Sequence, residues 1–252
     1  MRKSYRELTE EIKTDGERLK LIAALGSSDD LAYHYALISE DWAAGGTLML
    51  ENSFDRHGEA GIVFLLERLR AFGTDSKTDA SAAAGTAIGS GAYTDTAYLA
   101  AKILSQLRHR DFYAARAKKL AALLTARWEI SDIALRRKQI IALGWIGSEA
   151  EVDVLIRTMQ GDTDALCRAW AAAALMQLSF HAVDAAFLRE RTKTAFAVAI
   201  QKEGDLRAAG IMIEAAQTLF GKKWISAAAA EAAESESIEK ARKSALRFLG
   251  KA

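Results

Sequence analysis

An acidic residue opens a short apolar stretch seven times along this chain, once every 31–41 residues. An acid at a helix start accepts free backbone N–H groups and faces the positive end of the helix dipole, so each acid predicts a helix start. Five stretches end on a glycine, which can close a helix in the left-handed conformation. Recurrence at this spacing predicts a solenoid, in which each helix pair buries its apolar face against its neighbours. The acids are Asp15, Asp55, Asp95, Asp132, Asp164, Asp205 and Glu236, and the glycines are Gly26, Gly73, Gly147, Gly221 and Gly250.

The chain has no proline, and half of its 252 residues are hydrophobic. Absence of the strongest helix breaker favours an all-α fold, and the apolar content provides for a sizeable core. We expect one continuous domain over residues 1–252, with its clearest repeats at 132–180 and a less regular part at 1–80. Within that part, residues 29–53 predict one bent helix or two short ones broken at Gly45-Gly46, and residues 74–79 predict a loop.

The overall charge is close to neutral, with 34 Lys+Arg against 33 Asp+Glu. This balance argues against a protein that binds nucleic acid or a membrane surface through its bulk charge. The lone Cys167 cannot form an internal disulfide, which favours a reducing compartment. The first residues contain no apolar signal core, and no uncharged run approaches the roughly 20 residues of a membrane span. We therefore expect a cytoplasmic protein without a membrane segment.

The clearest repeat unit lies in the middle of the chain. Asp132 precedes Leu135-Arg136 and the ending Ala142-Leu143-Gly144-Trp145-Ile146-Gly147, and 32 residues later Asp164 precedes Arg168 and the ending Ala174-Leu175-Met176-Gln177-Leu178. These residues resemble HEAT repeats, and more narrowly the HEAT-like repeats of phycobilisome lyases. The resemblance implies an armadillo-like, right-handed α-α superhelix of about six to seven helix pairs. It also implies that Arg136 and Arg168 each pair with an acid of the adjacent repeat.

The sequence offers no convergent set of catalytic, cofactor-binding or metal-ligating residues. The four histidines share no short spacing with one another or with Cys167, whereas metal ligands usually come in closely spaced pairs. The densest polar cluster, Asp55-Arg56-His57-Gly58-Glu59, is interpreted as a capped and solvated helix start. We therefore expect a binding protein rather than an enzyme.

Two groups of residues are candidates for partner binding. Residues 102–138 hold ten Lys or Arg against three acids, so that Arg108, Arg116, Lys119 and Arg137 would suit an acidic peptide or a nucleic-acid backbone if they shared one surface. The alternative is that these cations solvate the outer faces of helices. In the second group, Lys138 and Trp145 are seven residues apart on one helix face, and Trp170 and Gln177 repeat this arrangement 32 residues later. A tryptophan beside a polar side chain is common at binding surfaces, although large aromatics are more often packing residues.

These observations favour a non-enzymatic interaction or scaffold module that binds a protein partner on the concave face of the solenoid. Two alternatives stay open. One is a HEAT-like DNA-binding protein or DNA glycosylase that uses a basic concave surface, as some members of the resembled class do. The other is an immunity or regulatory protein that blocks a single protein partner.

Overall fold

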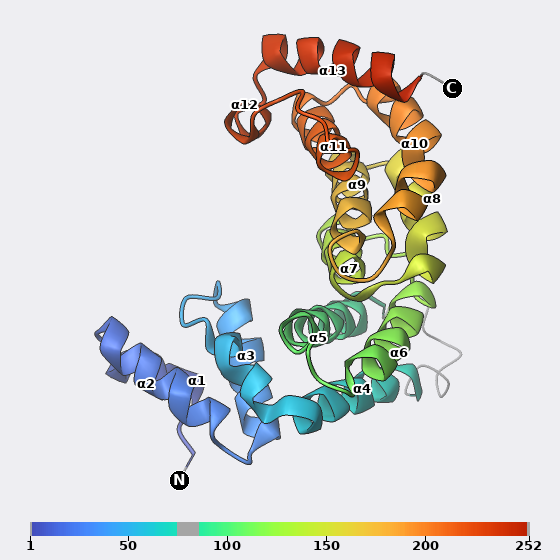
Figure 1. Ribbon diagram of the computed structural model, residues 1–252. Coiled ribbons are helices and arrows are strands. Elements are labelled where there is room, and N and C mark those ends of the chain that lie inside the picture. Colours follow the sequence, from blue (N-terminus) through green and yellow to red (C-terminus); the bar gives the residue numbers. More distant parts are fainter. Residues whose placement is uncertain (1, 75–85, 251–252) are drawn as a thin grey trace.

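The computed structural model describes residues 2–74 and 86–250, and this part of the chain contains thirteen α-helices and no strand (Figure 1). The helices form a C-shaped stack in which successive helix pairs lie side by side, which confirms the expected all-α solenoid. The loop expected at 74–79 lies outside the described residues from position 75 onward.

One limb of the C is formed by the N-terminal helices. Gly45 and Gly46, both with positive φ, separate two of its helices, which confirms the predicted break. The short 3₁₀ helix η1 packs against α2, α3, α4 and α5, and so joins this limb to the stack. The elements are α1 (Tyr5–Glu11), α2 (Asp15–Gly26), α3 (Leu31–Ala43), η1 (Leu50–His57) and α4 (Gly58–Thr74).

The rest of the chain alternates between an outer and an inner layer. The inner helices α5, α7, α9 and α11 pack on one another in order, and α4, α6, α8 and α10 lie behind them (Figure 1). The short α12 packs on α11, and α13 closes the stack across α10 and α11. The elements are α5 (Thr86–Gln106), α6 (Tyr113–Thr125), α7 (Ile133–Ile146), η3 (Glu149–Glu151), α8 (Val152–Gly161), α9 (Ala165–Leu178), α10 (Ala185–Lys202), α11 (Leu206–Leu219), α12 (Ala227–Glu231) and α13 (Ser235–Leu249).

The predicted acid caps are correct for the regular repeats. The carboxylates of Asp132, Asp164 and Asp205 accept the N–H groups of the third helical residues of α7, α9 and α11. The prediction was wrong for two other acids: Asp55 lies inside η1, and Asp95 lies in the middle of α5. An acid can start a helix only where the residues before it are not helical, and Asp95 follows residues that already belong to α5.

An arginine ladder links the central repeats, as the resemblance implied. Arg136 donates from Nη2 to Oδ1 of Asp162 at 2.8 Å. Arg168 makes a bidentate pair with Glu203, at 2.7 Å from Nε and 2.8 Å from Nη2. Each arginine also donates from Nη1 to the carbonyl six residues before it, at 2.8 Å for Ile130 and 2.7 Å for Asp162. Because planar guanidinium groups fix the geometry of their partners, the ladder sets the register between repeats.

The small residues of the repeat endings bring α7 and α9 into close contact. A Cβ atom at Gly144 would lie 2.8 Å from the Cβ atom and 2.9 Å from the Cα atom of Ala174. Both residues are buried. The pattern of small and large residues therefore predicts the helix packing because the backbones can meet only where side chains are absent or short.

A pair of histidines lies at the joint formed by η1. Nδ1 of His34 is 2.8 Å from Nε2 of His57, and Nε2 of His34 is 3.0 Å from the carbonyl oxygen of Leu50. Because a carbonyl only accepts, His34 carries its proton on Nε2, and its Nδ1 accepts the Nε2 proton of His57. The ring of Phe54 packs on both, with centroids 5.0 and 4.9 Å away. Both of these hydrogen bonds form when the two imidazoles are neutral.

We expect the stability of the fold to decrease as the pH falls below about 6.5, the ordinary pKa of an unfolded histidine. Burial lowers the pKa of His34, and His57 lowers it further, against the Leu50 carbonyl. Burial also lowers the pKa of His57, against Asp55 and Asp29, which raise it. The unfolded chain therefore takes up protons that the folded chain does not, so stability is full above the unfolded pKa and is lost as the pH falls toward the folded pKa values.

Urea denaturation between pH 8 and pH 5 measures this dependence. His57→Gln keeps a donor for His34 but cannot be protonated, so its stability should fall less on acidification than that of the unchanged protein. His109→Gln is the matched control, because His109 lies in the exposed connection after α5. An equal pH dependence in the two variants would contradict the assignment.

Candidate functional site

The inner helices present one face to the hollow of the C. Neighbouring inner helices and the outer layer cover other faces of α7, α9 and α11, and one set of accessible residues on each helix repeats at i, i+4, i+7 and i+11. We name these residues the concave stripe. On α7 they are Ala134, Lys138, Ile141 and Trp145, on α9 Leu166, Trp170, Ala173 and Gln177, and on α11 Arg207, Ile211, Glu214 and Thr218. None of them is buried.

All four residues of the predicted tryptophan stripe lie in the concave stripe. Lys138 and Trp170 occupy the same position on adjacent helices, and so do Trp145 and Gln177. Trp170 is 37% exposed, whereas Trp145 is half-buried against the ring of Tyr98, whose centroid is 5.1 Å away. Neither indole is a core residue. The side chains are therefore available to a partner, and their role in binding stays a prediction.

The structure adds two residues that the sequence did not single out, Trp42 and Tyr98. Trp42 of α3 and Tyr98 of α5 extend the aromatic row beyond Trp145, with Trp42 and Tyr98 centroids 6.1 Å apart. Nζ of Lys138 lies 5.7 Å from the centroid of Trp42 and 2.5 Å from Oδ1 of Asp95. Asp95 and Tyr98 are three residues apart and so lie on one helix face, a spacing that the sequence alone reveals. Trp42 offers no such signal, because the residue that it contacts on α7, Lys138, is far from it in the sequence.

The basic residues of the 102–138 segment lie on different layers. Arg116 and Lys119 belong to the outer helix α6, Arg137 belongs to the inner helix α7, and Arg108 follows α5. Arg116 pairs with Glu59 at 2.8 Å, and Arg108 donates to the Trp145 carbonyl at 3.0 Å. Lys119 is exposed. Much of the local positive charge is thus engaged in contacts within the protein.

Arg137 holds the carboxylate that caps α9. Its Nε and Nη2 lie 3.1 and 2.9 Å from the two oxygens of Asp164. The guanidinium, together with the backbone N–H of Cys167, lowers the pKa of Asp164 to about 2 even though burial opposes the shift. Asp164 therefore stays ionised, and Arg137 serves the helix cap.

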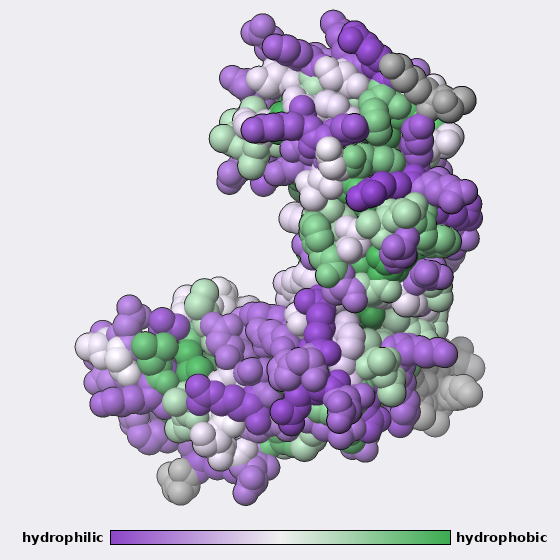
Figure 2. Space-filling model, viewed as in Figure 1, coloured by the Kyte–Doolittle hydropathy of each residue, from purple (hydrophilic) through white to green (hydrophobic). Residues whose placement is uncertain are grey.

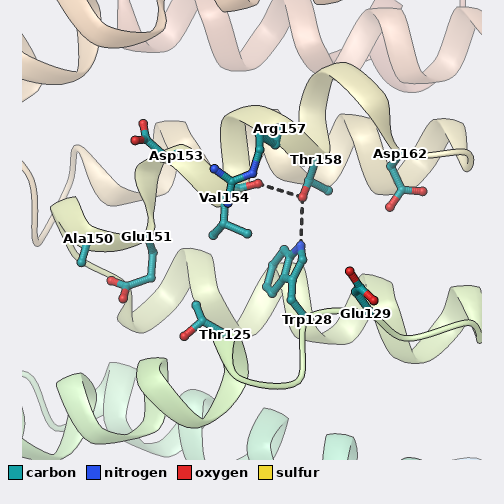
Figure 3. A pocket seen from close by; sticks show the side chains of 10 residues that line it. All are labelled: Thr125, Trp128, Glu129, Ala150, Glu151, Asp153, Val154, Arg157, Thr158 and Asp162. Atoms are coloured by element: carbon teal, nitrogen blue, oxygen red, sulfur yellow. Dashed lines mark hydrogen bonds between the residues drawn. The ribbon is translucent and has the colours of Figure 1, made fainter.

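A groove of about 710 Å³ lies on the outer side, between the α6–α7 connection and α8 (Figure 3). Nε1 of Trp128 donates to Oγ1 of Thr158 at 3.1 Å, and Thr158 donates in turn to the Val154 carbonyl at 2.9 Å. Of the acids that line the groove, Glu151 completes a helix cap with Ser148, and Asp162 belongs to the arginine ladder. These polar groups have structural partners.

The described residues provide neither a metal centre nor a reactive thiol. Within 2–74 and 86–250, no three His, Cys, Asp or Glu side chains are placed to hold a metal ion. Burial raises the pKa of the Cys167 thiol to about 11, so this thiol is protonated near neutral pH. In the same ranges, no helix combines the length and apolar character needed to cross a membrane.

Residues 86–176 match the family model described as HEAT repeats. The match begins with α5 and ends in α9, and so covers the helices that carry Tyr98, Trp145 and Trp170 as well as the first rung of the arginine ladder. No curated protein and no solved structure shows significant similarity to the chain. Residues 86–176 are therefore similar to HEAT repeats, and the alternating layers of helices agree with that similarity.

Proposed function

We propose that the protein is an interaction module that binds a protein partner on the concave stripe. The observation that carries the proposal is the accessible Trp170 in the middle of the inner layer, with Lys138 and Ile211 at the same position on the adjacent helices. A large aromatic side chain left partly exposed on a hollowed surface is the kind of residue that dominates binding energy at protein interfaces. HEAT repeats generally mediate protein–protein interaction or scaffolding, which supports the same reading.

Charge supports a protein partner over a nucleic acid. Lys138, Arg137 and Arg168 already pair with carboxylates of this chain. Phosphate binding would require these ion pairs to break, whereas an apolar contact with Trp170 would leave them intact.

A photo-crosslinking amino acid at position 170 tests the proposal in cells of the source organism. We expect a discrete covalent adduct from position 170 that protease removes and nuclease does not. Phe187 is the matched control, because it is 38% exposed but lies on the outer helix α10. Equal labelling from 170 and 187, or an adduct that nuclease removes, would contradict the proposal.

A further inference from the structure

The middle of the concave stripe is apolar. Ile141, Leu166, Trp170, Ala173 and Ile211 are partly or largely accessible there. Figure 2 shows white and green surface on the inner wall of the upper limb, while both ends of the C are mostly purple. An accessible apolar surface with polar margins is typical of a protein interaction site.

Each end of the hollow contains a segment that carries acids and no cations. Residues 21–55, which include the second half of α2 and all of α3, contain six Asp or Glu and no Lys or Arg. Residues 225–239, which contain α12, have four Glu and no Lys or Arg. A Cβ atom at Gly210 of α11 would lie 3.1 Å from the Ala230 carbonyl, so α12 lies directly beside the last helix of the concave stripe.

Several of these carboxylates are free to meet a partner. Glu40 is exposed on α3, and Glu231 is exposed at the end of α12. Glu214 is partly exposed within the concave stripe. None of the three forms an ion pair with a described residue, whereas the stripe's Lys138 is neutralised by Asp95. Arg207, in the first turn of α11, is the cation of the stripe that has no acidic partner among the described residues. Within the two acidic segments and the concave stripe, the free charge is therefore predominantly negative.

The distance between neighbouring inner helices in the concave stripe matches the rise of two turns of an α-helix. Packed helices lie about 8–10 Å apart, and seven residues of an α-helix rise about 10.5 Å, so positions i, i+7 and i+14 of a partner helix would meet successive inner helices on one face. An extended strand covers the same distance in about three residues. Because strand side chains alternate between two faces, every second anchor of such a strand would point away from the concave stripe.

We infer that the concave face binds a basic amphipathic helix, with its apolar side on the concave stripe and its Lys or Arg side chains toward the acidic segments 21–55 and 225–239. This inference rests on the proposed function and narrows it to one class of partner. Trp170 is the central anchor, and Glu40 and Glu231 select for positive charge at the two ends.

Synthetic helical peptides test the inference by fluorescence anisotropy with the full chain. The first peptide carries leucine on one face and lysine on the other, the second has glutamate in place of every lysine, and the third has serine in place of every leucine. We expect the leucine–lysine peptide to bind most tightly, and its affinity to fall as salt rises.

Variants of the protein locate the peptide. Trp170→Ala should weaken binding by about 10- to 30-fold, the effect of removing an interface anchor, while Phe187→Ala should have less than about a twofold effect. Glu40→Lys with Glu231→Lys should weaken binding by about 3- to 10-fold at low salt, because attraction is replaced by repulsion. Glu190→Lys, an exposed acid on the outer helix α10, is the matched control. Circular dichroism melts verify that each variant is folded.

The outcomes separate this inference from the proposed function. If the glutamate peptide binds as tightly as the lysine peptide and depends on Trp170, the preference for a basic partner is wrong and the concave docking face stands. If the lysine peptide binds equally to all variants, its binding is unspecific and the inference is wrong. If no peptide binds, the inference is also wrong, and crosslinking from position 170 decides the proposed function by itself.

Discussion

Replacing Arg168 with methionine is expected to lower the free energy of unfolding by about 3–5 kcal/mol, the loss associated with breaking a buried ion pair. The partner carboxylate of Glu203 is 1% exposed and would be left without its cation. Burial by itself raises the pKa of Glu203, but the bonds from Arg168 and from the Asp205 N–H outweigh it and keep this pKa below its ordinary value. Guanidinium chloride denaturation measures the change.

The exposed pair of Arg191 and Asp153 is the matched control. Its side chains are 54% and 55% exposed, so Arg191→Met should change stability by no more than about 1 kcal/mol. Adding Glu203→Met to Arg168→Met removes the stranded charge and should recover much of the loss. Equal losses in Arg168→Met and Arg191→Met would show that the buried pair does not hold the repeats together.

Replacing Phe54 with alanine is expected to cost about 3–5 kcal/mol, as truncation of a fully buried aromatic ring does. Phe54 is 0% exposed and packs on both histidines of the joint. Its loss would leave a cavity where the N-terminal limb meets the stack, because η1 contacts α2, α3, α4 and α5.

Thermal and chemical denaturation of Phe54→Ala should be compared with Phe180→Ala. Phe180 is 64% exposed after α9, so its truncation should cost less than about 0.5 kcal/mol. A loss of that small size in Phe54→Ala would mean that the joint is not packed around this ring.

The repeats could be predicted from the sequence because their signals are local. Asp132 and Asp164 accept N–H groups three residues away, and Gly144 and Ala174 report the close packing of neighbouring helices through their size alone. Asp95 shows where this reasoning ends. Its carboxylate pairs with Lys138 on another helix, and an acid in an ion pair has the same appearance in a sequence as an acid in a cap.

The candidate surface was predictable to the same extent. The 32-residue repeat placed Trp145 and Trp170 on equivalent helices, and the structure leaves both partly accessible. Trp42 could not be found in this way, because it reaches Lys138 from a limb that does not follow the repeat. The roles of the basic residues depended equally on distant partners, since Arg116 binds Glu59 of α4.

The arginine ladder also couples the movements of neighbouring repeats. The short segment 162–164 takes part in two rungs at once, because the Asp162 carboxylate accepts from Arg136 while the Asp162 carbonyl accepts from Arg168. A rotation of one repeat would thus be transmitted to the next through this shared connecting segment. We therefore expect bending of the C to occur at such connectors rather than within the helices.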